Sequence, residues 1–351
     1  MKSREYSLEV GGRILKAQFS DLADQANGSV IMSYGNTILL VTACMSKKPK
    51  DGDYFPLGVE YEERFYAAGK ILGGQYNKRE GRPSDEAILS GRVVDRTIRP
   101  LFEQYIRHEI QVVITVLSID KDDPDIVAII GASLALATSD IPWGGPVSAV
   151  RIGKITKENS SDFQVNPTYD DRAHTDSSLD MIACGQGGKI NMIEVGAKEI
   201  SNEVAHEALK KASEEIEKIQ EWQKNIISEM GKAKKVIDSP VSPEGMKELF
   251  AEKIAPKFLK EIFIGVSGKG HIGAVMEEWL GYYREKYPDE ILAKKTFAME
   301  YFEEMLNDLV HKEAIENNKR PDGRKPDEIR QLFAKAGGVS PIIHGTGIFY
   351  R

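Results

Sequence analysis

The sequence lacks the features of a membrane or secreted protein. It has only two cysteines, Cys44 and Cys184, both in apolar strand-like runs, so we expect two buried free thiols and find no support for a disulfide framework. The N-terminus has no apolar stretch resembling a signal peptide, and no run approaches the ~18 apolar residues of a membrane span. These absences predict a cytoplasmic protein in a reducing compartment, with no membrane partner.

An overall positive charge is also missing. The chain has 47 Lys and Arg against 54 Asp and Glu, a formal net charge of −7, which argues against a protein that simply coats nucleic acid. Any nucleic-acid site must therefore be a local basic surface. The composition, 41% hydrophobic and 29% charged, is that of a globular protein, and 351 residues allow two or three domains.

The pattern of the first two hundred residues predicts an α+β fold. Helices are expected over 84–99, 125–139 and 201–224, the second of them buried because it is almost entirely small or apolar. Strands come first and packed helices follow, which favours a sheet layer over a parallel βαβ series. The predicted strands, rich in β-branched residues, are 29–35, 37–46, 109–119 and 181–185.

Composition changes near Gly231. Pro240 and Pro243 are typical of a linker, and the following residues lose their β-branched runs and become helical and highly charged. We therefore expect a first domain over 1–235 and a small all-helical domain over 240–318.

The last residues, 321–351, repeat the start of the chain. Gly323-Arg324 echoes Gly12-Arg13, and Ile348-Phe349-Tyr350 echoes Ile38-Leu39-Leu40, at offsets of 311 and 310 residues. A chance coincidence of glycines is the alternative. A restarted motif that stops in mid-strand suggests a second domain that is truncated.

A basic island interrupts the acidic chain between residues 70 and 107. Arg92, Arg96 and Arg99 are spaced i, i+4 and i+7, so a helix projects all three from one face. The planar fork of arginine matches phosphate oxygens, which makes this face a candidate RNA site. The alternative is a solvated face with local pairs such as Asp95 with Arg99.

The loop before this helix, GGQYNKREGRPS, combines glycines, one aromatic ring and basic residues. Tyr76 could stack on a base while Lys78, Arg79 and Arg82 pair with phosphates, which is how single-stranded nucleic acid is held without sequence preference. An exposed turn would have the same composition.

Four segments give the chain a specific resemblance. FPLGVEYEER, REGRPS, DRTIRPLF and PDIVAIIGASLAL are similar to the first RNase-PH-type core of polynucleotide phosphorylase, and the similarity continues through the helical domain to RPDGR and HGTGIFYR. The resemblance implies an RNase-PH-like (ribosomal protein S5 domain 2-like) core followed by a small all-α domain and the opening of a second core.

The same resemblance implies an activity. The family is a phosphorolytic 3′→5′ exoribonuclease, or polyribonucleotide nucleotidyltransferase, in which inorganic phosphate releases nucleoside diphosphates, with Mg²⁺ as cofactor. Three chains form a ring around single-stranded RNA, and RNA-degradation machinery is a possible further partner. The family's channel loop has two aromatic and two basic residues and corresponds to Tyr76-Asn77-Lys78-Arg79, so Asn77 replaces the second ring.

Departures from the family pattern indicate that this core is degenerate. Where the active core has a phosphate-binding serine run, this chain has Asp123-Pro124-Asp125, whose carboxylates repel phosphate and whose proline lacks a donor. Of two Mg²⁺-binding aspartates six residues apart, only Asp180 is present, and His174 replaces the other. We expect no catalytic or metal-binding residue here, and expect both beyond residue 351.

Three hypotheses remain. The chain is part of an exoribonuclease whose active core lies beyond it; or it is a stand-alone, non-catalytic RNA-binding scaffold; or it is a stand-alone nuclease resembling RNase PH. The third needs a phosphate-binding serine cluster, and Asp123-Pro124-Asp125 argues against it.

Overall fold

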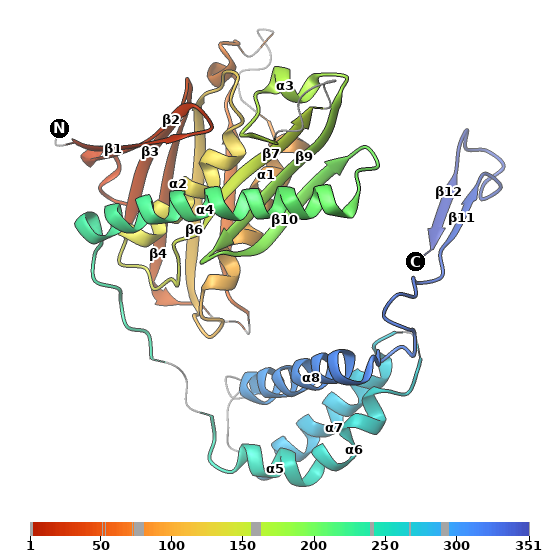
Figure 1. Cartoon of the computed structure of the whole chain (residues 1–351). Coiled ribbons are helices and arrows are strands. Elements are labelled where there is room, and N and C mark those ends of the chain that lie inside the picture. The colour runs from red at the N-terminus through yellow and green to blue at the C-terminus, as the bar shows by residue number, and fades with distance from the viewer. Residues whose placement is uncertain are drawn as a thin grey trace. The chain divides into compact units, whose positions relative to one another are not determined.

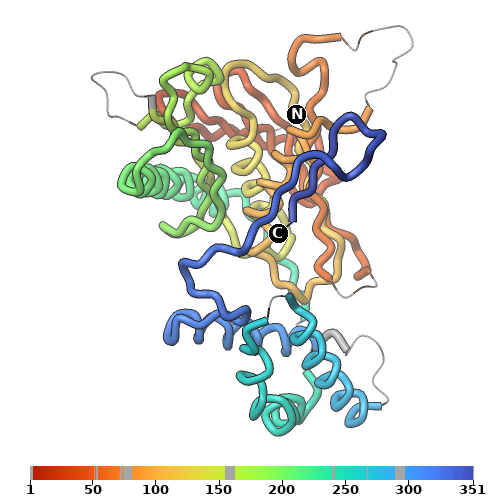
Figure 2. Tube along the Cα trace, turned by 90° about the vertical axis from the view of Figure 1, so that its right-hand side faces the viewer, coloured from red at the N-terminus to blue at the C-terminus, as the bar shows by residue number. Residues whose placement is uncertain are grey.

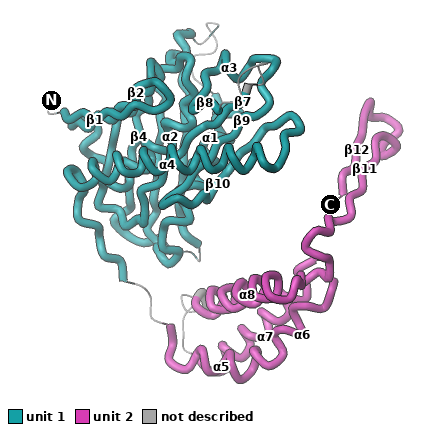
Figure 3. The backbone as a smooth tube through the Cα atoms, in the orientation of Figure 1, with its two compact units in different colours: residues 1–239 teal, residues 240–351 magenta. Residues whose placement is uncertain are grey.

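The structure is a computed structural model that describes residues 3–50, 52, 54–71, 73, 81–155, 163–238, 242–266, 268–288 and 295–350. The chain divides into two compact units, residues 1–239 and 240–351, drawn in different colours in Figure 3.

A six-stranded mixed sheet forms one layer of the first unit, in the order β1-β2-β3-β4-β6-β5. Neighbouring strands are antiparallel except β5 and β6, which are parallel and are joined through α1 (Asp85–Ile98). Side chains alternate between the two faces, so Leu15, Ala17 and Phe19 are buried while Lys16 and Gln18 are not. The strands are β1 (Ser3–Val10), β2 (Arg13–Ser20), β3 (Gly28–Tyr34), β4 (Thr37–Pro49), β5 (Leu57–Glu63) and β6 (His108–Ser118).

A second, antiparallel sheet has the order β10-β9-β7-β8. Its central strands β7 and β9 are mostly buried, whereas β10 exposes most of its residues at one edge. The strands are β7 (Ser148–Ile155), β8 (Phe163–Val165), β9 (Ser177–Gln186) and β10 (Lys189–Ala197).

Helices connect and cover the two sheets. α2 (Pro124–Thr138) is buried along almost its whole length and contacts β3 and β4 of the first sheet and β7 of the second. It approaches β4 closely because Gly131 has no side chain: a Cβ there would lie 2.7 Å from Val41 Cγ2. α1 contacts β5 and β10, and α4 (Asn202–Met230) packs against β7 and β9 (Figure 1). The prediction of an α+β fold is confirmed.

Short helical segments complete this unit. They are η1 (Asp21–Ala23), η2 (Phe65–Ala68), η3 (Arg99–Leu101) and α3 (Tyr169–Ala173). Across the ranges that the structure describes, no helix is both long enough and apolar enough to cross a membrane.

The second unit contains a group of helices (Figure 2). Their core is rich in aromatic side chains. Phe250 packs edge-on against both Phe258 and Trp279, and the Trp279 indole donates to Ala298 O at 2.8 Å. The helices are α5 (Met246–Lys253), α6 (Ala255–Ile262), α7 (Gly270–Lys286) and α8 (Lys295–Asn317).

An exposed hairpin of β11 (Phe333–Ala336) and β12 (Gly347–Tyr350) follows these helices. Phe333 pairs with Tyr350 and Ala336 pairs with Gly347. Ile348-Phe349-Tyr350 lies in β12, and residues 38–40, which it is predicted to match, lie in β4, so both segments are strands. The match between them stays a prediction.

The two cysteines are both free, but only one is buried. Cys184 lies in the core on β9, and burial raises the pKa of its thiol to about 12. Cys44 is exposed on β4, because Leu39, Val41 and Ala43 point into the core and the next residue points out. The expectation of a buried thiol at Cys44 was wrong: an apolar run alone does not show which face of a strand is covered.

Candidate functional site: an ion-paired cluster at the start of α2

Asp123-Pro124-Asp125 forms the N-terminus of α2. Asp123 is the residue before the first turn, and its Oδ1 accepts a hydrogen bond from the backbone N–H of Asp125 at 2.9 Å. Pro124 takes the first helical position, where its missing N–H costs nothing, and both carboxylates face the positive end of the helix dipole. The positive end of this helix, which could attract a phosphate, is therefore already occupied by the chain's own acidic groups.

Arg151 of β7 joins these carboxylates to a third one. Its Nη2 lies 2.7 Å from Asp123 Oδ2 and 3.8 Å from Asp125 Oδ2. Its Nη1 donates to both carboxylate oxygens of Asp180 on β9, at 3.0 and 2.9 Å. The Arg151 side chain is only 9% exposed, so these interactions act where solvent screens them little.

A second guanidinium reaches the same acids from α3. Arg172 Nη1 lies 3.1 Å from Asp123 Oδ2 and 3.6 Å from Asp180 Oδ2. The Arg172 guanidinium also stacks over the ring of Tyr169, 4.6 Å from its centroid. Two guanidinium groups and three carboxylates thus form one cluster, which we call the α2 cluster: Asp123, Asp125, Arg151, Arg172 and Asp180.

One carboxyl of the α2 cluster, that of Asp125, has a raised pKa because of burial and the neighbouring acids. Burial, the neighbouring Asp123 carboxylate and Glu63 raise the pKa of Asp125 to about 7, although a hydrogen bond with Ser90 and the charge of Arg151 oppose the shift. Two positive charges balance two carboxylates, and Arg151 lies closer to Asp123 and Asp180 than to Asp125. Burial likewise raises the pKa of Glu63, which lies near the cluster.

This raised pKa gives stability a definite pH dependence. Folded Asp125 holds its proton up to about pH 7, whereas an unfolded aspartate has a pKa near 3.8. Protonation of Asp125 in the folded state therefore contributes to the free energy of unfolding. This contribution is fully present below pH 3.8 and is lost as pH rises to about 7. We expect Asp125→Asn to become more stable relative to the wild type over this range, by up to about 1.4 kcal/mol per pH unit. Urea unfolding at a series of pH values measures the difference.

The control is Asp170→Asn, which removes an exposed carboxylate from nearby α3. Its stability should follow that of the wild type at every pH. Parallel pH profiles for Asp125→Asn and the wild type would show that folding does not change the pKa of Asp125.

His174 lies outside the α2 cluster. It ends α3 and is exposed, with its Nδ1 3.6 Å from Asp176 Oδ2. Asp123, Asp125 and Asp180 are brought together as a group, while His174 is not joined to them. Sequence reasoning missed Arg151 and Arg172. The available signal was a single arginine in the apolar run VSAVRI, because a charge in a buried strand needs a partner.

The hydroxyl of Tyr61 lies near the cluster and has no hydrogen-bond partner among the described residues. Tyr61 is buried, and burial together with the charge of Asp125 raises its pKa well above the ordinary value. Within the described residues, no three Asp, Glu, His or Cys side chains are arranged to hold a metal ion.

The predicted arginine stripe on α1 divides into two kinds of residue. Arg99 pairs with Asp95 at 2.7 and 3.0 Å and also donates to Leu57 O at 3.1 Å, so its guanidinium is engaged within the fold. Arg92 and Arg96 are exposed, and neither forms an ion pair with another described residue. Two of the three guanidinium groups are therefore available to a ligand.

Two cavities accompany this face. One of about 400 Å³ lies between β5 and α1 and includes Arg92 and Arg99 in its lining. Another, of about 610 Å³, includes Lys70 and the exposed Arg82, and the two share Glu62, Pro83 and Ala87. The predicted RNA-binding residues Tyr76, Lys78 and Arg79 lie outside the described residues.

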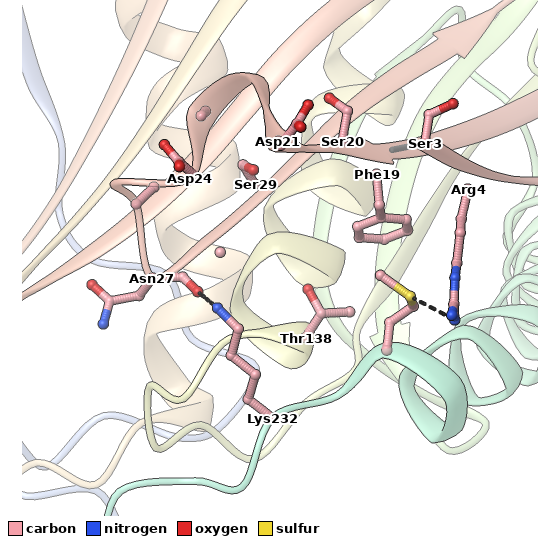
Figure 4. A pocket seen from close by; sticks show the side chains of 14 residues that line it. Ser3, Arg4, Phe19, Ser20, Asp21, Asp24, Asn27, Ser29, Thr138 and Lys232 are labelled. Carbon is pink, nitrogen blue, oxygen red and sulfur yellow. Dashed lines mark hydrogen bonds between the residues drawn. The ribbon is translucent and has the colours of Figure 1, made fainter. Parts of the chain in front are cut away.

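A further cavity, of about 530 Å³, opens at the other end of α2, beside Thr138 (Figure 4). Its two basic side chains already contact the protein: Lys232 Nζ donates to Asn27 O at 2.8 Å, and Arg4 Nη1 lies 3.4 Å from Met230 Sδ. Asp21 and Asp24 line the same cavity. Because its basic groups are engaged and it contains acids, it is a poor site for phosphate.

Two family comparisons match the first unit. Residues 11–142 match domain 1 of the 3′ exoribonuclease family, and residues 145–215 match domain 2 of that family. The boundary falls between α2 and β7, so the α2 cluster is built from both segments.

Curated relatives match along the whole chain. Polyribonucleotide nucleotidyltransferase of Syntrophomonas wolfei is 41% identical over 99% of this chain and 48% of its own length. The proteins of the same name from Caldicellulosiruptor saccharolyticus and Lysinibacillus sphaericus are 40% and 41% identical, each over 100% of this chain and 49% of its own length. The chain thus spans about half the length of the curated relatives it matches. Among solved structures, rice (Oryza sativa) Rrp46 is 12% identical with a TM-score of 0.48, covering 64% of this chain and 94% of its own.

Proposed function

Because the chain belongs to the 3′ exoribonuclease family, we propose that it is the RNA-binding and ring-forming part of a polyribonucleotide nucleotidyltransferase. The whole protein would degrade RNA from its 3′ end by phosphorolysis, with inorganic phosphate as co-substrate. In this proposal a first RNase-PH-like core occupies residues 1–235, an all-helical domain 240–318, and the opening of a second core 321–351.

One observation supports the assignment of RNA binding to this core and of catalysis to another core. The helix end that would have to receive phosphate holds Asp123 and Asp125, and Arg151 is bonded to the acid at the metal-binding position, Asp180. A phosphate entering here would meet carboxylates that repel it, which raises the barrier to a reaction between two anions. Catalysis would therefore belong to a core other than this one, and that core would hold Mg²⁺.

The RNA-binding role rests on the α1 face. Arg92 and Arg96 are exposed and one turn apart, and the exposed Arg82 lines the adjoining cavity. Together with Tyr76, Lys78 and Arg79 of the preceding loop, these residues would hold the backbone of single-stranded RNA and stack on a base. A trimeric ring, a cytoplasmic location and association with other RNA-degrading proteins belong to the same proposal.

Substitution of Tyr76 tests the stacking part of this proposal. Tyr76→Ala should weaken the binding of a single-stranded oligoribonucleotide by about 1–3 kcal/mol if one base stacks on the ring. Fluorescence anisotropy with a labelled oligonucleotide measures the effect.

Tyr76→Phe is the control, because it keeps the ring and removes only the hydroxyl. It should bind like the wild type. If the alanine variant also binds like the wild type, Tyr76 does not contact RNA.

A further inference from the structure

The positions that the family resemblance associates with Mg²⁺ do not fit this cation. His174 is exposed and lies against Asp176, and the Asp180 carboxylate is held by Arg151 through both of its oxygens. We infer that Arg151 takes the place of a divalent cation in this core. Its guanidinium holds Asp123, Asp125 and Asp180 together, keeps Mg²⁺ and Mn²⁺ away from them, and on removal leaves a divalent-cation site.

The geometry of Arg151 supports this assignment. Both terminal nitrogens of its guanidinium contact carboxylates, whereas its buried Nε has no partner among the described residues. The orientation of the guanidinium is thus fixed by the acids alone. The backbone of Arg151 is anchored separately, because its N–H donates to Asn166 Oδ1 and its carbonyl accepts from the N–H of Asn166, at 2.8 and 2.7 Å.

The charges of the two arginines also support the inference. Arg151 and Arg172 together carry two positive charges, the charge of one divalent cation, and they contact the same oxygens of Asp123 and Asp180. Carboxylate oxygens are the ligands that Mg²⁺ and Mn²⁺ prefer. Here they surround a guanidinium, and no three acids among the described residues are placed to hold a metal ion.

The inference is independent of RNA binding, since it concerns only how one buried acidic cluster is neutralised. It can therefore fail while the proposed RNA binding holds, and RNA binding can fail while the inference holds.

Thermal unfolding of the 351-residue chain in EDTA, MgCl₂ or MnCl₂ tests the inference. The wild type should unfold at the same temperature in all three. Arg151→Ala should unfold at a lower temperature in EDTA, and saturating Mn²⁺ should raise its Tm by about 5–10 °C. Arg151→Ala/Asp180→Asn should lose this response, because it lacks one of the acids. Arg151→Lys keeps a positive charge and should respond less than Arg151→Ala.

Three outcomes would overturn the inference. One is a rise in the wild-type Tm with Mg²⁺ or Mn²⁺ that Asp180→Asn abolishes, because the acids would then bind a cation with Arg151 in place. Another is a folded Arg151→Ala that does not respond to either cation. If Arg151→Ala does not fold in EDTA, we expect Mn²⁺ to restore its fold as followed by circular dichroism, and a failure to do so is the third.

Discussion

Arg151→Met should lower the free energy of unfolding by about 3–5 kcal/mol at pH 7.5. The substitution keeps most of the side-chain volume but leaves Asp123 and Asp180 with Arg172 as their one positive partner among the described residues. Removing one member of a buried ion pair is costly because the remaining charge stays buried without compensation. Urea unfolding followed by tryptophan fluorescence measures the change.

The matched comparison is Arg151→Met/Asp180→Asn, which removes one uncompensated carboxylate as well. It should be more stable than Arg151→Met alone, and with Asp180→Asn measured as well, the double-mutant cycle gives the coupling between the two side chains. A wild-type stability for Arg151→Met would mean that the α2 cluster contributes nothing to folding.

Arg92→Glu/Arg96→Glu should weaken the binding of single-stranded RNA strongly and make it less dependent on salt. For every phosphate that the variant no longer neutralises, the slope of log K against log salt should fall by about 0.7. Both side chains are exposed and free of ion pairs with the described residues, so the fold should tolerate the change. Anisotropy titrations from 50 to 300 mM KCl, roughly the range over which such interactions are screened, measure affinity and slope together.

Lys210→Glu/Lys224→Glu is the control for net charge. It makes the same change in charge at two exposed positions of α4. It should bind single-stranded RNA more tightly than Arg92→Glu/Arg96→Glu does. Its slope of log K against log salt should be close to that of the wild type. Equal losses in both variants would mean that overall charge, and not the α1 face, governs binding.

Much of the fold follows from local sequence patterns. The predicted strand 29–35 corresponds to β3, and the buried helix predicted over 125–139 corresponds to α2. The predicted RNase-PH-like core is confirmed by the two family segments, and the resemblance to the first core of polynucleotide phosphorylase by the curated relatives. Long β-branched runs and apolar helices bury on all sides, so their composition identifies them without tertiary information.

Several strands that the sequence did not predict have one polar face. β2 alternates buried Leu15, Ala17 and Phe19 with Lys16 and Gln18, and β10 exposes nearly every residue. Composition alone does not identify such strands, because half of their residues are typical of loops or helix surfaces. The order of the strands in the sheet was not predicted either. β5 pairs with β6 although α1 lies between them in the sequence, and this pairing depends on how α1 packs against the sheet.

The candidate site could likewise be predicted only in part from the sequence. Asp123, Asp125 and Asp180 could be identified from the family pattern, but their partners Arg151 and Arg172 come from two other elements, and no local spacing joins them. Arg99 shows the opposite case. Its i, i+4 pairing with Asp95 is local and was weighed from the sequence alone, whereas its hydrogen bond to Leu57 O depends on how α1 packs against β5.

The most direct test of the central claim, that this core binds RNA without cleaving it, is an assay for phosphorolysis. The purified chain is incubated with a single-stranded oligoribonucleotide, Mg²⁺ and inorganic phosphate, and nucleoside diphosphates are quantified while binding is followed in parallel. We predict that RNA is bound and that no nucleoside diphosphate is released, because the carboxylates of Asp123 and Asp125 occupy the start of α2 and repel phosphate. Release of nucleoside diphosphate that disappears on Asp180→Asn would contradict this account.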